Sequence, residues 1–86
     1  MKLKSNFITH NSGDIQIMVA AGDTDFHGIV KSNITSAFII ECLKNDCSRQ
    51  EIIEKMLVKY DADEKIITED VDKVLDVLRS IDAIEE

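Results

Sequence analysis

The chain contains few residues of the kinds that form metal sites, phosphate-binding loops or catalytic nucleophiles. Its two histidines, His10 and His27, fall in different predicted strands, and its two cysteines are Cys42 and Cys47. The three glycines are scattered, so they form no glycine-rich phosphate loop, and no serine stands in a nucleophile-elbow context. We therefore expect a protein that is not an enzyme and that has neither a metal site nor a cofactor.

One short motif, Asn33-Ile34-Thr35, has the form of an N-glycosylation acceptor. The opening segment MKLKSNFITH has two lysines but lacks the apolar run of about 7–15 residues that a secretory signal requires. No segment approaches the roughly 18 consecutive apolar residues of a transmembrane helix. We therefore predict a cytoplasmic protein with no membrane partner, in which the sequon carries no sugar and both cysteines stay reduced.

The length of 86 residues predicts a single small domain, 1–86, without internal repeats or linkers. Its first third predicts three strands: FITH (7–10), IQIMVA (15–20) and FHGIV (26–30), joined by short polar loops that suit an antiparallel meander. In the second strand the odd-numbered residues are aliphatic, whereas the even-numbered ones are mixed in character. Such alternation is typical of a sheet that is covered on one side.

A helical period begins after these strands. Asn33 is placed to cap an apolar helix that ends near Leu43, and the apolar residues of this helix spread around most of its circumference. A helix with this distribution is expected at the centre of a domain, in contact with neighbours on several faces.

Two more helices follow. A capping box, Ser48 to Glu51, begins a second helix that runs to Tyr60. Thr68 is the expected N-cap of a third helix, Glu69–Ile81, which follows the loop DADEK. The order of elements predicts an α+β domain, in which a three-stranded antiparallel sheet is followed by three helices in a winged helix-turn-helix-like arrangement.

This fold class leaves a DNA-binding regulator and a small adaptor or oligomerisation module as alternatives. The net charge is −7, and the last predicted helix carries Glu69, Asp70, Asp72 and Asp76 against two basic residues. Because affinity for a duplex comes from Lys and Arg that neutralise phosphates, this acidic surface argues against nucleic acid as a partner.

The run FHGIVKSNITSAFIIECL, residues 26–43, resembles a pattern of the PqqD-like family, in which Phe-x-Gly and two aliphatic residues lead to Leu-Asn-x-Thr, small residues and an aromatic helix centre. The segments CSRQEIIEKMLVKYDAD (47–63) and EDVDKVLDVLRSIDAIEE (69–86) resemble later parts of the same pattern. The chain departs from it at Ser32, where the family usually has leucine, and at Ile40, where many members have tryptophan. These two residues indicate a groove of different shape.

The resemblance implies a domain that binds the leader segment of a ribosomally made precursor peptide and presents it to a modifying enzyme, commonly a radical S-adenosylmethionine enzyme. In the family the leader adds as a strand to the edge of the third strand, with side chains against the last helix. The resemblance therefore implies peptide-binding residues on both elements: Phe26, His27, Gly28, Ile29, Val30, Lys31, Asp70, Lys73, Val74, Val77 and Ile81.

Two of these expectations can be argued from the residues themselves. A helical wheel does not require Val77 in the core stripe of the last helix, so an apolar residue there suits a binding surface. An edge strand offers unpaired N–H and C=O groups to an incoming peptide. Gly28 either permits close backbone approach or marks a bulge or bend.

Overall fold

The computed structural model describes residues 1–22 and 28–86. Strands and helices follow one another in this order: β1 (Lys2–Leu3), β2 (Phe7–Ser12), β3 (Ile15–Ala20), β4 (Ile29–Ser32), α1 (Ile34–Cys42), α2 (Arg49–Lys59), α3 (Glu64–Ser80) and β5 (Ile84–Glu85). The predicted α+β order of a three-stranded sheet followed by three helices is confirmed. The short strands β1 and β5, which pair with each other in antiparallel orientation, were not predicted.

The main sheet has the strand order β2-β3-β4, and both pairs are antiparallel. Ser12 pairs with Ile15, so β2 and β3 are joined by a tight turn over Gly13 and Asp14. Gly13 has φ +60°, a left-handed conformation that glycine adopts without a steric penalty. Because β4 pairs only with β3 among the described strands, its other edge is open.

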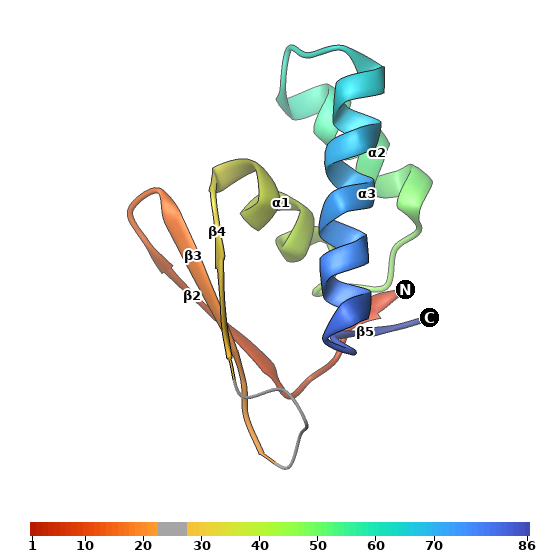
Figure 1. Cartoon of the computed structure of the whole chain (residues 1–86). Coiled ribbons are helices and arrows are strands. Elements are labelled where there is room, and N and C mark those ends of the chain that lie inside the picture. The colour runs from red at the N-terminus through yellow and green to blue at the C-terminus, as the bar shows by residue number, and fades with distance from the viewer. Residues whose placement is uncertain (23–27) are drawn as a thin grey trace.

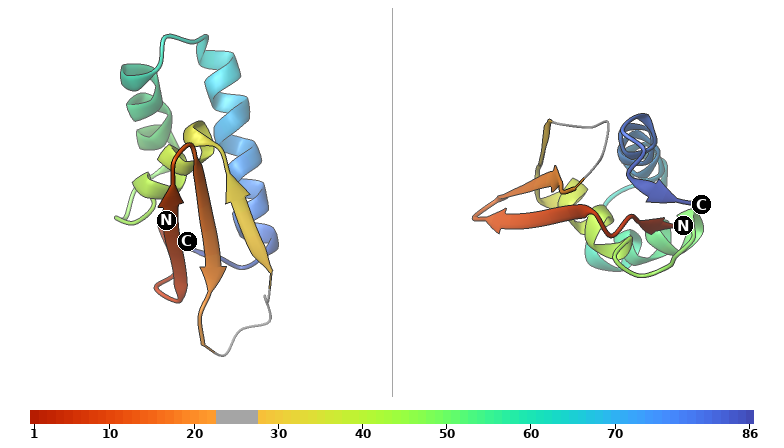
Figure 2. Two further views of the ribbon diagram at one scale, coloured as in Figure 1. Left: turned by 90° about the vertical axis from the view of Figure 1, so that its left-hand side faces the viewer. Right: turned by 90° about the horizontal axis from the view of Figure 1, so that it is seen from below.

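The helices cover one face of the sheet and leave the other face without a described element over it (Figures 1 and 2). Helix α1 lies between the sheet and the α2–α3 pair, and β4 is the strand of the main sheet nearest to α3. This arrangement puts the open edge of β4 beside the longest helix of the chain.

The covered face of β3 is the mixed one. Gln16 and Met18 are buried against the helices, whereas Ile15 and Val19 point outward and remain exposed. The alternation of the strand therefore correctly predicts a sheet covered on one side. The structure adds that the aliphatic face is the uncovered one. The amide of Gln16 is tolerated inside because its nitrogen donates hydrogen bonds to Asn11 Oδ1 and Glu41 Oε1, each at 3.1 Å.

Helix α1 is central, as its apolar circumference predicts. Ile39, Ile40 and the following Leu43 are fully buried, and the helix contacts β3, β4, α2 and α3. Asn33 is its N-cap, and the Asn33 side chain accepts a hydrogen bond of 2.9 Å from the backbone N–H of Ser36. The sequon thus forms the first turn of a core helix.

Helix α2 begins at the predicted capping box. Ser48 Oγ accepts from the Glu51 N–H and the Glu51 carboxylate accepts from the Ser48 N–H, both at 3.1 Å. The first helical residue, Arg49, also binds α3 through two hydrogen bonds to the Asp72 carboxylate, at 2.6 and 3.0 Å. This ion pair holds the beginning of α2 against α3.

The predicted start of the third helix was wrong. Helix α3 begins at Glu64, and its N-cap is Asp63, whose side chain accepts a 2.8 Å hydrogen bond from the Lys65 N–H. Thr68 lies inside the helix, one residue after the buried Ile67. The earlier start is stable because Ile67, four residues before Val71, extends the buried stripe by one turn toward the N-terminus of the helix.

Cys42 and Cys47 are free and buried, one in α1 and one in the connection to α2, as predicted. Cys47 Sγ donates to the Cys42 carbonyl oxygen at 3.4 Å. Burial is the main cause that raises the pKa of both thiols, so little thiolate forms at neutral pH. Over residues 1–22 and 28–86, no helix is long and apolar enough to cross a membrane.

Candidate functional site

The open edge of β4 is lined by side chains of alternating direction. Val30 and Ser32 point to the covered side of the sheet, in register with Met18 and Gln16 of β3. Ile29 and Lys31 point to the uncovered side, and Ile29 is 63% exposed. An extended peptide that paired with this edge would therefore meet a different set of side chains on each face.

A groove of about 200 Å³ lies between β4 and α3 on the covered side of the sheet. We call it the β4–α3 groove, and its lining residues come from β4, α1 and α3: Val30, Lys31, Ser32, Ser36, Ile40, Lys73, Val74, Val77 and Leu78. Ile40 and Leu78 are fully buried and form its apolar floor. Val77 is 48% exposed, so an apolar side chain on its wall is open to a ligand.

A second hollow of about 170 Å³ continues the groove toward the beginning of α1. It shares Ser36, Lys73 and Val74 with the groove and adds Asn33, Thr35 and Asp70. Together the two hollows offer an apolar surface at one end and hydroxyl, amide and carboxylate groups at the other. This combination suits a peptide with both apolar and polar side chains.

The charges around the groove differ from those of the chain as a whole. The groove lining includes Lys31 and Lys73 and no acidic residue, although the protein carries 17 acidic and 10 basic residues. Neither lysine forms an ion pair within the described part of the chain. Asp70 lies only in the adjoining hollow. Because the Lys31 side chain points to the uncovered side of the sheet, Lys73 is the cationic side chain on the covered side of the groove.

The structure brings together five of the residues that the resemblance implied: Val30, Lys31, Lys73, Val74 and Val77. Asp70 joins them through the adjoining hollow, and Ile29 lies on the same edge but faces the opposite side of the sheet. Gly28 is exposed in a bend just before β4. Ile81 lines neither hollow, because it packs against the hydrophobic core after the end of α3. Phe26 and His27 lie outside the described residues.

Sequence reasoning missed the groove residues Ser36 and Leu78 and did not assign Ser32 or Ile40 to the site. Ser32 and Ile40 are the two departures from the family pattern, and both contribute to the groove lining. Their departure from the family pattern indicated a groove of different shape, although neither was named among the peptide-binding residues. The apolar floor was missed because a buried isoleucine or leucine that also borders a groove has the same sequence pattern as an ordinary core residue.

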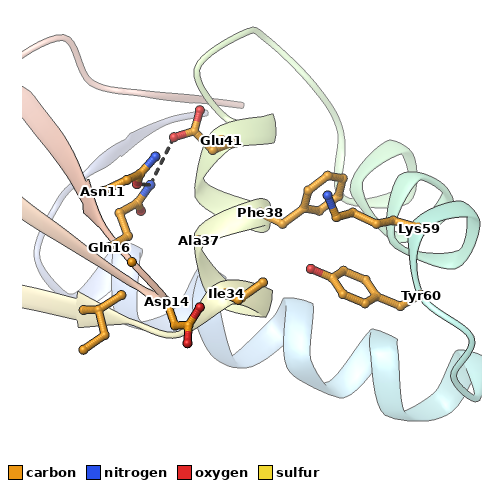
Figure 3. Close-up of a pocket in the computed structure, with 11 residues that line it drawn as sticks. Asn11, Asp14, Gln16, Ile34, Ala37, Phe38, Glu41, Lys59 and Tyr60 are labelled. Carbon is orange, nitrogen blue, oxygen red and sulfur yellow. Dashed lines mark hydrogen bonds between the residues drawn. The ribbon is translucent and has the colours of Figure 1, made fainter.

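A separate pocket of about 240 Å³ lies on another face of α1 (Figure 3). The tip of the β2–β3 hairpin, α1 and the end of α2 line it, and it shares no residue with the β4–α3 groove. Phe38 and Tyr60 form an edge-to-face pair with ring centroids 6.0 Å apart, and Lys59 Nζ lies 4.8 Å from the Phe38 centroid. These contacts fix the end of α2 against α1.

Two polar atoms in this pocket lack a hydrogen-bond partner in the described part of the chain: Gln16 Oε1 and Tyr60 Oη. Figure 3 places Gln16 and Tyr60 on opposite sides, with Ile34 and Ala37 of α1 between them. Both atoms are covered by neighbouring atoms. The pocket therefore presents mainly apolar and aromatic surface, and we assign it no ligand.

The fold and the groove define an α+β domain of winged-helix-like shape with an open sheet edge beside a helix. The profile of the family described as Coenzyme PQQ synthesis protein D (PqqD) matches residues 17–84. The chain belongs to this family, and the matched range includes β3 from Ile17 onward, β4, all three helices and the whole β4–α3 groove.

A solved structure described as TbiB1 in Complex with the TbiA(beta) Leader Peptide is similar to this chain, with a TM-score of 0.82. The two sequences are 15% identical, and the superposition covers 99% of this chain and 95% of TbiB1. At this identity the likeness establishes the fold and leaves the ligand to separate arguments. No curated protein sequence matches the chain significantly.

Proposed function

We propose that this protein is a non-enzymatic recognition domain that binds the leader segment of a ribosomally made precursor peptide. The leader adds as a strand to the open edge of β4 and places alternate side chains in the β4–α3 groove. The observation that carries this proposal is the open edge of β4 beside an apolar groove with a half-exposed valine, Val77, on its wall.

Strand addition fits the physical chemistry of this edge. The N–H and C=O groups on the open side of β4 have no strand partner among the described residues, and an extended peptide supplies both kinds of partner. The groove then provides selectivity through the side chains that it accepts. Membership of the PqqD family and the likeness to a protein solved with a leader peptide support the same interpretation.

The domain presents the bound precursor peptide to a modifying enzyme in the cytoplasm. The family suggests a radical S-adenosylmethionine enzyme as the first candidate. A leader bound along β4 is held at one edge of the domain, so its continuation is free to extend into another protein. In this role the domain itself needs no catalytic group. Within the described residues, no cluster of His, Cys, Asp and Glu is suited to hold a metal ion.

The direct test measures the affinity of a fluorescently labelled leader of a short peptide encoded beside the gene. Val77→Asp introduces a charge into the apolar wall of the groove and should weaken binding at least about tenfold, because an apolar contact is replaced by a carboxylate that must be desolvated. Val58→Asp on α2 is the matched control, since Val58 is 89% exposed and lies outside the groove. Equal affinities of the two variants for the leader would contradict the proposal.

A further inference from the structure

The uncovered face of the sheet is apolar and has no acidic side chain on its three strands. Ile8, Val19 and Ile29 lie side by side across β2, β3 and β4, and all three are exposed. The next row consists of His10, Ile17 and Lys31. Figure 2, left, shows this face with the helices behind it. Both rows end at the open edge of β4.

A peptide strand that adds to β4 would extend these rows by one position. In an antiparallel pair, directly opposite residues point to the same face and have Cβ atoms about 4.5–5.5 Å apart. The peptide residue opposite Ile29 would extend the aliphatic row, and the residue opposite Lys31 would stand beside an ammonium group. Favourable partners are an apolar side chain in the first case and a carboxylate in the second.

The residue between these two points to the covered side of the sheet. It lies opposite Val30 and faces the β4–α3 groove, where Ile40, Val77 and Leu78 provide apolar surface. An apolar side chain is again the favourable occupant. Three successive peptide residues are thus specified by three successive residues of β4.

We infer that the ligand of the β4 edge carries the sequence acidic–apolar–apolar, read from its N-terminus, opposite Lys31, Val30 and Ile29 in that order. The order follows from antiparallel addition, which continues the pairing of the whole main sheet. This inference rests on the proposed strand addition and adds to it the side-chain pattern of the ligand. The acidic residue determines selectivity. Lys31 is the only lysine or arginine that β2, β3 and β4, as described, place on the uncovered face of the sheet.

The experiment is a selection of random displayed peptides on the immobilised full chain, which requires no knowledge of the natural leader. Recovered peptides that lose binding to Val77→Asp are aligned and compared with the starting library. The expected result is enrichment of Asp or Glu directly before two apolar residues. Enrichment of the reverse order, apolar–apolar–acidic, would overturn the antiparallel assignment.

The selected acidic peptide then tests the contact itself. Lys31→Glu should weaken its binding by about threefold to tenfold, because the charge reversal replaces an attractive cross-strand pair by a repulsive one. A matched peptide with Lys in place of the acidic residue should show the opposite preference. Lys55→Glu on α2 makes the same change of charge away from the groove and should leave both affinities unchanged.

Different results would contradict the proposed peptide-binding function and the inferred side-chain pattern of the ligand. If no recovered peptide depends on Val77, the proposed peptide-binding function is contradicted. If peptides depend on Val77 but lack the acidic residue, or bind Lys31→Glu as well as the wild-type protein, the inferred pattern is overturned while strand addition stands.

Discussion

Gln16 combines a fully buried position, 1% exposed, with a carbonyl oxygen that has no partner among the described residues. Its amide nitrogen donates hydrogen bonds to the side chains of Asn11 and Glu41. Neither acceptor residue is fully buried, so both can also bond to water. The stabilising hydrogen bonds of this residue are therefore partly offset by an unpaired buried oxygen, which costs about 1–3 kcal/mol.

This balance predicts a mild effect of Gln16→Met. The apolar side chain has a similar volume and removes the unpaired oxygen together with two hydrogen bonds, so we expect the free energy of unfolding to change by less than about 1 kcal/mol. Met18→Ala, at the neighbouring inward position, creates a cavity and should cost about 2–5 kcal/mol. Urea denaturation of both variants measures the difference, and a large loss in Gln16→Met would mean that its hydrogen bonds dominate.

Single residues also mark the limit of sequence reasoning about the site. Val77 was identifiable because an apolar residue outside the core stripe needs an explanation, and the structure places it on the groove wall. Ile81 was assigned to the same flank, but the helix ends at Ser80 and Ile81 turns into the core. A helical wheel extends the helical geometry past Ser80, whereas the backbone of the chain leaves that geometry at Ile81.

At the scale of elements, strong local signals were sufficient for α1 and α2. Asn33, Ser48 and Glu51 form the predicted caps, because their hydrogen bonds depend only on residues close in sequence. The start of α3 was missed because Asp63 and Thr68 are both acceptable N-caps, and the choice depends on burial of Ile67. The two-residue strands β1 and β5 have no sequence period to detect, since their pairing joins distant parts of the chain.

The contact between α2 and α3 predicts a pH-dependent stability. The hydrogen bonds from Arg49 are the largest cause that lowers the pKa of Asp72 below its ordinary value of 3.8. A carboxyl group whose pKa is lowered by folding stabilises the folded state at pH values above its ordinary pKa. This contribution is lost as the pH falls through the lowered pKa.

Asp72→Asn should therefore destabilise the protein at neutral pH and have less effect as the pH falls below 3.8. Asp76→Asn is the control, because the Asp76 carboxylate lies 3.8 Å from Arg79 and makes no hydrogen bond within the described chain. Chemical denaturation at several pH values measures both variants. A constant difference between Asp72→Asn and the wild-type protein from neutral to acidic pH would contradict this account.

The edge position of β4 predicts an asymmetry between two adjacent proline substitutions. In an antiparallel edge strand, successive N–H groups alternate between the partner strand and the open side. Of Ile29→Pro and Val30→Pro, one removes an N–H that bonds β3 and the other removes an N–H available to a peptide.

We expect one of the two variants to keep nearly wild-type stability and lose peptide affinity, while the other loses stability. Thermal unfolding and anisotropy measurements with the labelled leader are made on the same samples. If both prolines unfold the domain, β4 is an interior strand and the open edge does not exist.

At the scale of the whole molecule, the distribution of charge separates the possible partners. The chain has a net charge of −7, yet the lining of the β4–α3 groove includes no acidic residue, and Lys73 is the cationic side chain on its covered side. An acidic surface with a small positive groove favours a short peptide over a nucleic acid duplex, which requires many cationic contacts. Sequence composition predicts that nucleic acid is not a partner, but only the fold shows that the groove beside β4 is lined without acidic residues.

Local sequence also does not determine which face of the sheet is covered by the helices. The alternation in β3 predicts two unlike faces, but whether Gln16 or Ile17 turns inward depends on partners in β2 and α1 that local sequence cannot supply. The result is an aliphatic uncovered face that continues to the open edge of β4. Residues of the groove and of the outer face thus meet along one strand.

The central claim is that a leader peptide binds along β4 and against α3. We would titrate the ¹⁵N-labelled protein with the leader encoded beside the gene and follow its backbone amide signals. The account predicts saturable shifts concentrated in residues 28–32 and 70–78, with the pocket formed by Phe38 and Tyr60 unaffected. Saturable shifts confined to that pocket, or to α2, would contradict it.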